Sequence, residues 1–207
     1  MTFLRSLRNK RWIFLTTRKL RKIIRSVAAS GNNLNLNIGS GTVEMDGWIN
    51  LDLPIFDVTK EESWGKMLGT ARFDNAILEH VFEHLRPDEV ETALHIFKLY
   101  MKATSNIRIA VPDKNHPNPD YIEYTRPGGS GPGADDHKSF WSIEGFKEIA
   151  ENCGFDLLPL EYYSSSGELI SNEMNLDRGR VQRSARNELN SPIKDYSSLI
   201  FDLRLQQ

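Results

Sequence analysis

The sequence predicts an α/β protein with a doubly wound, mostly parallel central sheet and helices on both faces. Three observations lead to this prediction. Short apolar runs read as buried strands, a segment with one apolar face at helical spacing follows one of them, and glycines or polar residues stand where each run ends. In open α/β sheets, ligands bind at the carboxyl ends of the strands. We therefore look for function first at these positions.

The first strand signal is the run 34–38, which ends in a glycine turn made of Gly39 and Gly41. A second short run, 48–51, ends in Asp52. Glycines let the backbone approach a ligand closely, and a carboxylate at the end of the next strand accepts hydrogen bonds from ribose hydroxyls. This order of residues predicts a site for a nucleoside cofactor.

The glycine turn is not a dinucleotide fingerprint. That fingerprint reads G-x-G-x-x-G, with the acid about 20 residues further on. Here Glu44 occupies the position of the third glycine, and Asp52 follows Gly39 by only 13 positions. The spacing argues against a nicotinamide or flavin cofactor. It also leaves little room for a helix between the two strands.

Two further strands are predicted downstream. Residues 73–78 read as a buried strand, and the segment 80–85 follows it directly. Residues 87–102 read as a helix, because apolar residues recur at i, i+3, i+4 and i+7. Residues 106–111 read as another strand, closed by Pro112 and Asp113. A helix beginning with Ser142 as its N-cap is expected next.

Several motifs occur in order along the chain: Asn37–Gly41, Gly47–Asp52, Phe73-Asp74 with His80–Leu85, Arg108–Asp113, and later 177–184 with 198–202. Together they resemble the class I S-adenosylmethionine-dependent methyltransferases. More narrowly, they resemble a group of small bacterial and viral members associated with glycan synthesis. The resemblance runs from about Leu34 to the C-terminus. It implies a Rossmann-like fold, S-adenosylmethionine as cofactor and S-adenosylhomocysteine as product.

The resemblance also implies where the cofactor is held. Gly39 and Gly41 would bring backbone against the methionine part and the ribose. Asp52 would hold the ribose hydroxyls, Asp57 the adenine amino group, and Glu79 would lie beside the methionine moiety. The expected cofactor-binding set is Asn37, Gly39, Ser40, Gly41, Asp52, Asp57 and Glu79.

Transfer of a methyl group to a hydroxyl requires a base, because the acceptor must lose a proton. His137 is the first candidate, since it follows the glycine-rich stretch 126–134 and two carboxylates precede it. Asp113 and His80 follow in that order, because each lies after a predicted strand. His84 is expected to be structural. The expected substrate-binding residues are His116, Asp136, Arg180 and Arg183.

The expected acceptor is a hydroxyl of a sugar, glycan or glycolipid, and this choice rests on the resemblance. A small metabolite is the alternative acceptor. A nucleic acid is not expected, because the chain beyond its N-terminal segment is acidic and has no aromatic-basic patch. A catalytically silent module that keeps the fold and binds a partner is a further alternative. The oligomeric state stays open.

A competing motif lies at His80–His84, which matches H-x-x-E-H, the inverted zinc-protease signature. Its two histidines would bind zinc, and Glu83 would act as base. The motif follows a buried strand directly and precedes Pro87, so its helix would be short. No third protein ligand is identifiable from the sequence. We therefore expect no metal at the site.

The chain divides into a basic N-terminal helical segment, 1–30, and one methyltransferase domain, 31–207. Nine of the first 25 residues are basic, and no acidic residue precedes Glu44. No apolar run there is long enough for a membrane span or a secretory signal, so a cytoplasmic location is expected. Three interpretations remain: a helix packed on the domain, contact with an anionic membrane, or a targeting or nucleic-acid segment. Removal of residues 1–30 is expected to weaken binding to anionic vesicles.

Residues 113–141 form a predicted insertion, because the stretch 127–133 is almost entirely Gly and Pro and cannot be a regular element. Long loops in compact domains are usually functional or disordered. This one follows a strand end on the ligand side, which favours a substrate lid. The single cysteine, Cys153, excludes an internal disulfide and is expected to be a buried thiol at a helix end capped by glycine.

Overall fold

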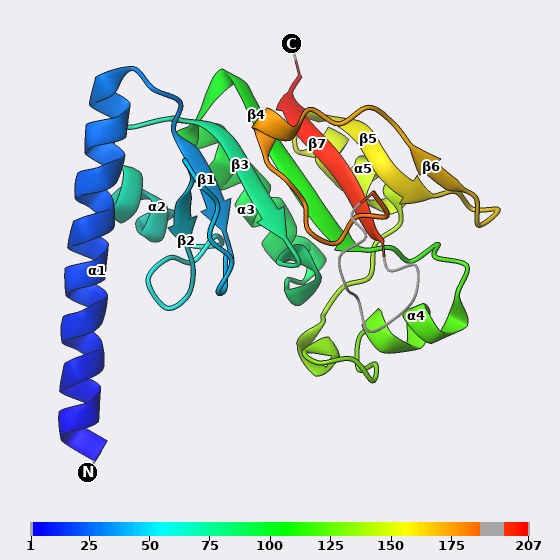
Figure 1. The fold of residues 1–207 in the computed structure, drawn as a ribbon, viewed down its shortest axis with the longest axis horizontal. Helices are drawn as coiled ribbons and strands as arrows, with labels where there is room; N and C mark the ends of the chain where they lie inside the picture. The colour runs from blue at the N-terminus through cyan, green and yellow to red at the C-terminus, as the bar shows by residue number, and fades with distance from the viewer. Residues whose placement is uncertain (1, 187–196, 207) are drawn as a thin grey trace.

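The computed structural model describes residues 2–186 and 197–206. Figure 1 shows one sheet with helices packed against it and a long helix at its edge. The helices are α1 (Thr2–Ser30), α2 (Glu61–Leu68), α3 (Pro87–Tyr100), α4 (Pro119–Thr125) and α5 (Ile143–Asn152), with 3-10 turns η1 (Phe82–His84), η2 (Ala134–Asp136) and η3 (Leu176–Arg178). The strands are β1 (Asn35–Ile38), β2 (Ile49–Leu51), β3 (Phe73–Glu79), β4 (Met101–Pro112), β5 (Phe155–Tyr163), β6 (Leu169–Ser171) and β7 (Ser198–Leu205).

The seven strands form a single sheet in the order β2-β1-β3-β4-β7-β5-β6. Strands β2, β1, β3 and β4 pair in parallel. Strand β7 inserts between β4 and β5 and is antiparallel to both, and β6 forms an antiparallel pair with β5. The predicted fold class, α/β with a mostly parallel Rossmann-like core, is confirmed.

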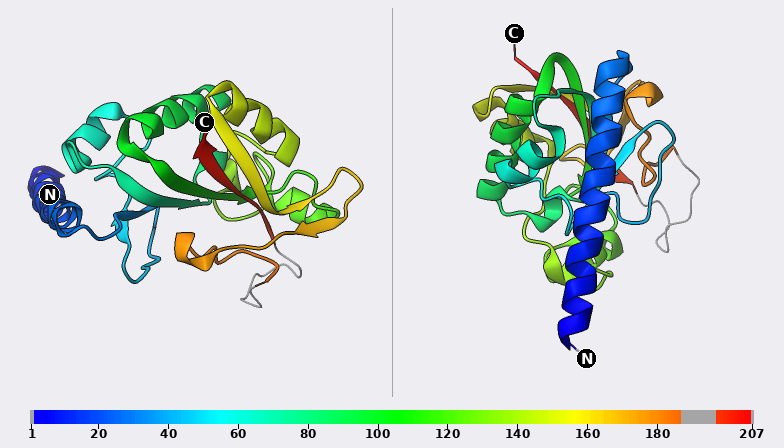
Figure 2. Two further views of the ribbon diagram at one scale, coloured as in Figure 1. Left: turned by 90° about the horizontal axis from the view of Figure 1, so that it is seen from above. Right: turned by 90° about the vertical axis from the view of Figure 1, so that its left-hand side faces the viewer.

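One face of the sheet carries the main hydrophobic core. Side chains alternate between the two faces of a strand. On this face, apolar side chains of β3, β4 and β7 pack beneath α2, α3 and α5; among them are Leu78, Ile109 and Phe201. The left-hand view of Figure 2 shows these three helices side by side on that face. Trp64 of α2 is fully buried there, and its ring packs against Phe97 of α3.

The other face of the sheet is polar along much of its length, and the expectation of helices on both faces is wrong for it. Irregular segments cover it, chiefly 40–48 and 172–186, around a small cluster that includes Ile77 and Val181. The physical reason is hydrogen bonding. A helix uses its own backbone groups internally, whereas an irregular segment offers carbonyls and N–H groups to polar side chains of the sheet. We call residues 172–186 the strap.

Arg108 of β4 is the largest polar side chain on this face and is fully buried. Its guanidinium forms two hydrogen bonds to the Asp202 carboxylate of β7, at 2.8 and 3.0 Å. It also donates to the backbone carbonyls of Asn175 and Gly179 in the strap. One arginine therefore joins two strands and the strap that covers them.

The local predictions hold with shifted boundaries. No helix separates β1 from β2, as the short spacing predicted. Ser142 caps α5 by accepting from the backbone N–H of Gly145, and Cys153 is a buried free thiol at the end of that helix. The helix predicted for 87–102 ends at Tyr100, because β4 begins at once with Met101. Strand β4 therefore starts five residues before the predicted start at Asn106. Its pairing with β3 changes register between Phe73 and Asn75, where a β-bulge takes up the extra residues of β4.

Residues 113–141, which we call the lid, are not wholly irregular. They contain the short helix α4, which Asn118 caps by accepting from the backbone N–H of Asp120. The glycine-rich stretch after α4 has no regular helix or strand before η2, as predicted. Figure 1 shows α4 at the lower edge of the molecule, beyond the carboxyl end of β4.

Helix α1 lies at the β2 edge of the molecule. Its C-terminal half packs on the domain: Ile24 is fully buried, with Leu20 and Val27 beside it. Both Figure 1 and the right-hand view of Figure 2 show its N-terminal half extending beyond the rest of the molecule. Trp12, Phe14 and Leu15 are more than half exposed there. Among the described residues, no helix is both long enough and apolar enough to cross a bilayer.

Candidate functional site

A cavity of about 530 Å³ lies at the carboxyl ends of β1 and β3. Four segments form its wall: the glycine turn after β1, the end of β3 with His80 and His84, the lid, and the strap. Its volume is within the range of small-molecule sites. The position agrees with the general rule for open α/β sheets.

The glycine turn forms one side of the cavity. Gly39 and Gly41 both have positive φ angles, of 69° and 53°. A Cβ atom at Gly39 would lie only 2.3 Å from Val81 Cγ2, so the close approach of the two loops requires glycine there. Asn37, beneath the turn, donates to the Val43 carbonyl and to Asn50, which fixes the loop after β1. Ser40 also lines the cavity.

Asp52 stands directly after β2, next to the glycine turn. Its Oδ2 accepts from the backbone N–H of Gly41 at 3.0 Å, and its Oδ1 accepts from Leu53 N–H at 2.8 Å. Each carboxylate oxygen has a second lone pair that stays available for a ligand hydroxyl. The predicted pairing of a glycine turn with an acid at the next strand end is therefore present, although Asp52 itself is not part of the cavity wall.

His80 has a positive φ angle of 56°, which is unusual for a residue other than glycine. Its Nδ1 lies 2.7 Å from Oε1 of buried Glu83, and its Nε2 lies 3.1 Å from Ser198 Oγ. Burial raises the pKa of Glu83, but the close contact with His80 and the charges of His80 and His84 outweigh it, so the pKa is lowered. Glu83 is therefore ionised. Because both ring nitrogens of His80 face partners, its role as a base is less well supported than that of His137.

His137 lines the cavity from the lid side. Its Nδ1 lies 2.7 Å from the Thr125 carbonyl oxygen, which can only accept, so Nδ1 carries the proton and the lone pair is on Nε2. The His137 ring meets the His84 ring edge to face at 4.8 Å. Asp136 Oδ2 lies 3.3 Å from His84 Nδ1. His137, the expected base, and Asp136, an expected substrate-binding residue, thus both lie next to His84, which was expected to be structural.

Backbone hydrogen bonds hold this part of the lid against the end of β3. Lys138 and Ser139 donate their backbone N–H groups to the Glu83 carbonyl, at 2.7 and 3.1 Å. Ser139 Oγ donates to the Phe82 carbonyl at 3.0 Å. These contacts join residues more than fifty positions apart. They explain why His137 lies beside His84.

Glu79, at the end of β3, lines the cavity and anchors the strap. Its two carboxylate oxygens accept from the backbone N–H groups of Gln182 and Arg183, at 2.9 and 2.8 Å. That Glu79 lies beside the methionine moiety of the cofactor stays a prediction, and its place in the cavity wall is compatible with it. Its hydrogen bonds to the strap could not be read from the sequence.

The arginines of the strap divide into two pairs. Arg180 and Arg183 line the cavity, as the substrate-binding prediction requires. Arg178 instead donates to Asn106, and Arg186 contacts Ser171 and the Asn172 carbonyl. The first pair adds positive charge to the cavity wall, whereas the second pair holds the strap.

Five predicted site residues lie outside the cavity wall. Asp52 and Asp136 border it, as described above, and the other three are His116, Asp57 and Asp113. His116 is 5% exposed and stacks on Tyr121 with ring centroids 3.8 Å apart. Asp57 accepts from the backbone N–H and the hydroxyl of Thr59, in the turn before α2. Asp113 is fully buried, and its two oxygens accept from the backbone N–H groups of Asn115 and Tyr163. The structure thus gives each of them a clear structural contact.

The pKa of Asp113 is raised from 3.8 to about 6, chiefly by burial. A carboxyl group with a folded pKa above its unfolded value stabilises the protein at low pH, and this contribution is lost as pH rises through about 6. Each pKa unit corresponds to 1.36 kcal/mol, so the change is up to about 3 kcal/mol. We expect urea denaturation between pH 4 and 7 to show this loss in the wild type and not in Asp113→Asn. Parallel pH profiles would contradict the assignment.

Sequence reasoning missed several wall residues. Val43, Met45 and Ile77 give the glycine side of the cavity an apolar surface, and Tyr124 and Pro132 belong to the lid. No short-range signal marks them, because each reaches the cavity through the tertiary fold. The sequence places Tyr124 within the predicted lid, but its position at the cavity wall depends on helix α4, which was not predicted from the sequence.

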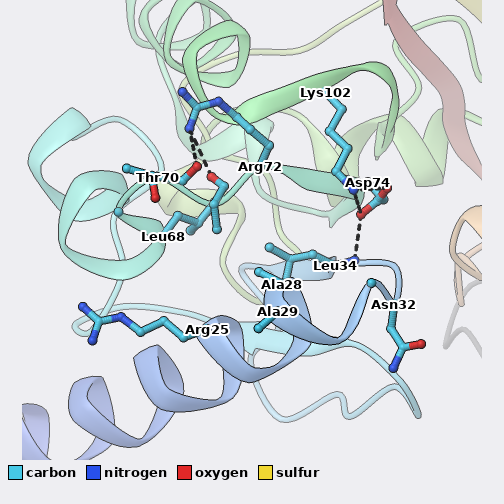
Figure 3. A pocket seen from close by; sticks show the side chains of 13 residues that line it. Arg25, Ala28, Ala29, Asn32, Leu34, Leu68, Thr70, Arg72, Asp74 and Lys102 are labelled. Carbon is cyan, nitrogen blue, oxygen red and sulfur yellow. Dashed lines mark hydrogen bonds and ion pairs between the residues drawn. The ribbon is translucent and has the colours of Figure 1, made fainter.

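Two larger hollows lie elsewhere. One, of about 660 Å³, is at the opposite edge of the sheet, between the end of α1 and the start of β3. Figure 3 shows that Asp74 there is already bound by Lys102 and by the backbone N–H of Leu34. The other, of about 1140 Å³, runs along α1 and reaches Lys66 of α2. Neither is at the carboxyl edge, so we place the site at the smaller cavity.

The zinc-protease interpretation of His80–His84 does not match the geometry. That motif requires two histidines one turn apart on an α-helix, whereas only the three-residue η1 is present, and His80 has a positive φ angle. His80 also contacts Ser198. The two histidines of the motif therefore do not face a common point as that site requires.

No protein-family model matches the sequence, and a search of curated proteins gives no significant match. Similar solved structures include S-adenosylmethionine-dependent methyltransferases. One from Archaeoglobus fulgidus is 18% identical, with 92% of each chain covered and a TM-score of 0.48. The 1,6-didemethyltoxoflavin-N1-methyltransferase of Burkholderia thailandensis, with bound S-adenosylhomocysteine, is 15% identical, covers 99% of this chain and 86% of its own, and has a TM-score of 0.48. The Synechocystis magnesium protoporphyrin IX methyltransferase, also with bound S-adenosylhomocysteine, is 10% identical, with 93% and 84% covered and a TM-score of 0.45. At these identities we argue function from the site itself.

Proposed function

We propose that this protein is an S-adenosylmethionine-dependent methyltransferase that methylates a hydroxyl of a sugar or glycan. The observation that supports this most is the cavity itself. It brings the glycine turn, with Asp52 hydrogen-bonded to it, opposite the histidines of the lid and of the end of β3. A nucleoside cofactor and an acceptor would thus meet in one space.

The residues present fit the cofactor. Gly41 leaves room for backbone approach, because no atom lies within 4 Å of where its Cβ would stand, and Gly39 lets the turn pack against Val81. Asp52 supplies free lone pairs for ribose hydroxyls, and Met45 and Ile77 supply an apolar wall. Bound S-adenosylmethionine supplies a methyl group that its sulfonium already activates.

The protein's part in catalysis is to orient the acceptor and remove its proton. The lone pair on His137 Nε2 is the group we assign to activating the hydroxyl, because Thr125 fixes the proton on the other nitrogen. Positioned groups of this kind contribute about 10²–10⁴-fold to rate. Arg180 and Arg183 would bind an anionic or hydroxyl-rich acceptor, which favours a sugar over an apolar metabolite.

The test is calorimetric titration of the full-length protein with S-adenosylmethionine and S-adenosylhomocysteine. We expect one-to-one binding. Replacing Asp52 with Ala should weaken it by at least tenfold, because charged hydrogen bonds are worth about 1.5–3 kcal/mol each. Asp156→Ala is the matched control, since that side chain is exposed on β5 and does not line the cavity. No binding by folded wild-type protein would favour the silent module, and turnover on small metabolites alone would replace the sugar acceptor.

We further propose that α1 contacts an anionic membrane surface, which would suit a glycolipid acceptor. Exposed Trp12, Phe14 and Leu15 lie among basic residues on the half of the helix that extends beyond the molecule. An interfacial helix combines aromatic or apolar residues with basic ones in this way. The proposal does not require any part of α1 to leave the domain.

Reversing two charges of α1, in Arg18→Glu with Lys22→Glu, is expected to lower partition onto phosphatidylserine vesicles by at least tenfold. Each basic residue near such a surface contributes about 1 kcal/mol. Lys147→Glu on exposed α5 is the matched control. Point variants are preferable to removal of residues 1–30, because that deletion would also remove buried Ile24. Sedimentation equal to wild type would rule out the membrane contact.

A further inference from the structure

Three potential metal ligands converge at the lid side of the cavity. One ligand atom each from Glu83, His84 and His137 lies within 4.8 Å of the others. They come from η1 and from the lid, and the hydrogen bonds of Lys138 and Ser139 to the Glu83 carbonyl hold the two segments together. This group differs from the H-x-x-E-H motif, because it replaces His80 with His137.

The carboxylate of Glu83 is buried, and it lies against His80 in an ion pair that is not an aligned hydrogen bond. The residue is only 1% exposed, and within the described part of the chain neither carboxylate oxygen accepts an aligned hydrogen bond. The contact of Oε1 with His80 Nδ1 is close, at 2.7 Å, but lies off the hydrogen-bonding direction. His84 Nδ1 is also buried and without an aligned partner there. Leaving a buried polar group unsatisfied costs about 1–3 kcal/mol. A missing ion is one recognised explanation for such groups.

The surroundings of the two histidines are those of metal ligands. A ligating histidine usually donates its other ring N–H to a carbonyl or a carboxylate, which orients the ring. His137 donates its Nδ1–H to the Thr125 carbonyl, so Nε2 carries the free lone pair. Asp136 Oδ2 lies 3.3 Å from His84 Nδ1, so it adds negative charge beside the nitrogen that would bind the ion.

We propose that Glu83, His84 and His137 bind a divalent transition-metal ion, with zinc as the best match. Two imidazoles and one carboxylate form a three-ligand set that leaves the fourth position of zinc open. Magnesium and calcium prefer all-oxygen sites and do not match. Ligand atoms on one zinc ion lie about 3.3 Å apart in a tetrahedral arrangement. Binding would therefore draw these side chains slightly together.

The open position would face the acceptor, because His84 and His137 line the cavity. A hydroxyl bound there would lose its proton to water more readily, since the cation stabilises the alkoxide. This use of the ion rests on the proposed function, whereas binding of the ion does not. The lone pair on His137 Nε2 would then act through the metal rather than take the proton itself.

The experiment is calorimetric titration of chelator-treated, full-length protein with zinc chloride, and with magnesium chloride for comparison. We expect one zinc ion per chain and no magnesium binding. His137→Asn keeps a donor for the Thr125 carbonyl but removes Nε2, and Glu83→Gln keeps the shape of the buried side chain. Both should weaken zinc binding by more than the 10- to 100-fold that loss of an outer-shell partner costs. His95→Asn, on the exposed side of α3, is the matched control and should bind as wild type.

Absence of stoichiometric zinc binding by the wild type, or equal binding by His137→Asn, would overturn the proposal. X-ray absorption of the zinc-loaded wild type provides a second test that needs no variant. Two imidazoles and one carboxylate are expected around the ion, and a spectrum without imidazole would contradict the site. Titrating the same samples with S-adenosylmethionine separates the two proposals. Cofactor binding without zinc refutes only the metal site, and zinc binding without the cofactor refutes only the methyltransferase.

Discussion

Replacing His137 with Asn is expected to lower kcat by about 10²–10⁴-fold and to leave the Kd for S-adenosylmethionine unchanged. The asparagine amide keeps a donor for the Thr125 carbonyl, so the lid should stay in place. What disappears is the Nε2 lone pair at the cavity wall. Methyl-transfer assays with a sugar acceptor, combined with cofactor titration, measure the two quantities separately.

The variant also distinguishes two ways in which His137 can act. If a bound metal activates the acceptor, treating the wild type with a chelator should lower its rate toward that of His137→Asn. If the imidazole takes the proton directly, the chelated wild type keeps its rate. His95→Asn serves as the control and should match wild type in every assay, because that side chain is exposed on α3. A His137→Asn enzyme with wild-type turnover would remove His137 from the reaction.

The second large effect is expected for Arg108→Met, which should lower the free energy of unfolding by about 3–5 kcal/mol. The substitution keeps much of the volume but leaves the Asp202 carboxylate buried, at 3% exposed, without its charged partner. It also removes donors from the carbonyls of Asn175 and Gly179, so the strap loses two attachments. Urea denaturation of the full-length protein measures the loss.

A double variant shows whether the cost comes from the unpaired charge. Replacing both partners of a buried ion pair by apolar residues is often neutral or stabilising. Arg108→Met with Asp202→Leu should therefore be more stable than Arg108→Met alone. Arg126→Met, which breaks an exposed pair with Glu123, is the control and should change stability by no more than about 1 kcal/mol. If Arg108→Met were as mild as this control, the buried pair would not hold the strands together.

The parts of the site that could be predicted are those determined by neighbours in sequence. The glycine turn and Asp52 were found because a turn and the strands on either side of it leave a local pattern. The place of His84 in the cavity wall and the burial of Asp113 could not be predicted from neighbouring residues. His84 meets His137 only because the lid folds back on η1, and Asp113 is buried by Tyr163 of β5. Hydrogen bonds between distant segments have no periodic signature.

The same reasoning explains the error about the second face of the sheet. Asn106, Arg108 and Asp202 read as isolated polar residues within apolar strands, and a sequence pattern does not show that they share one face with a covering loop. Their partners are backbone groups of the strap or side chains far away in the chain. The general expectation of helices on both faces therefore did not show that this polar face requires an irregular covering segment.

Glu79 holds the strap through the main-chain N–H groups of Gln182 and Arg183. Nearly every amino acid supplies the same N–H group, so the identity of residues 182 and 183 is not needed for their attachment. Natural selection can therefore change these two side chains, which line the cavity, while the backbone beneath them keeps its place. The chemistry of this part of the cavity wall is free to diverge among descendants without a new fold.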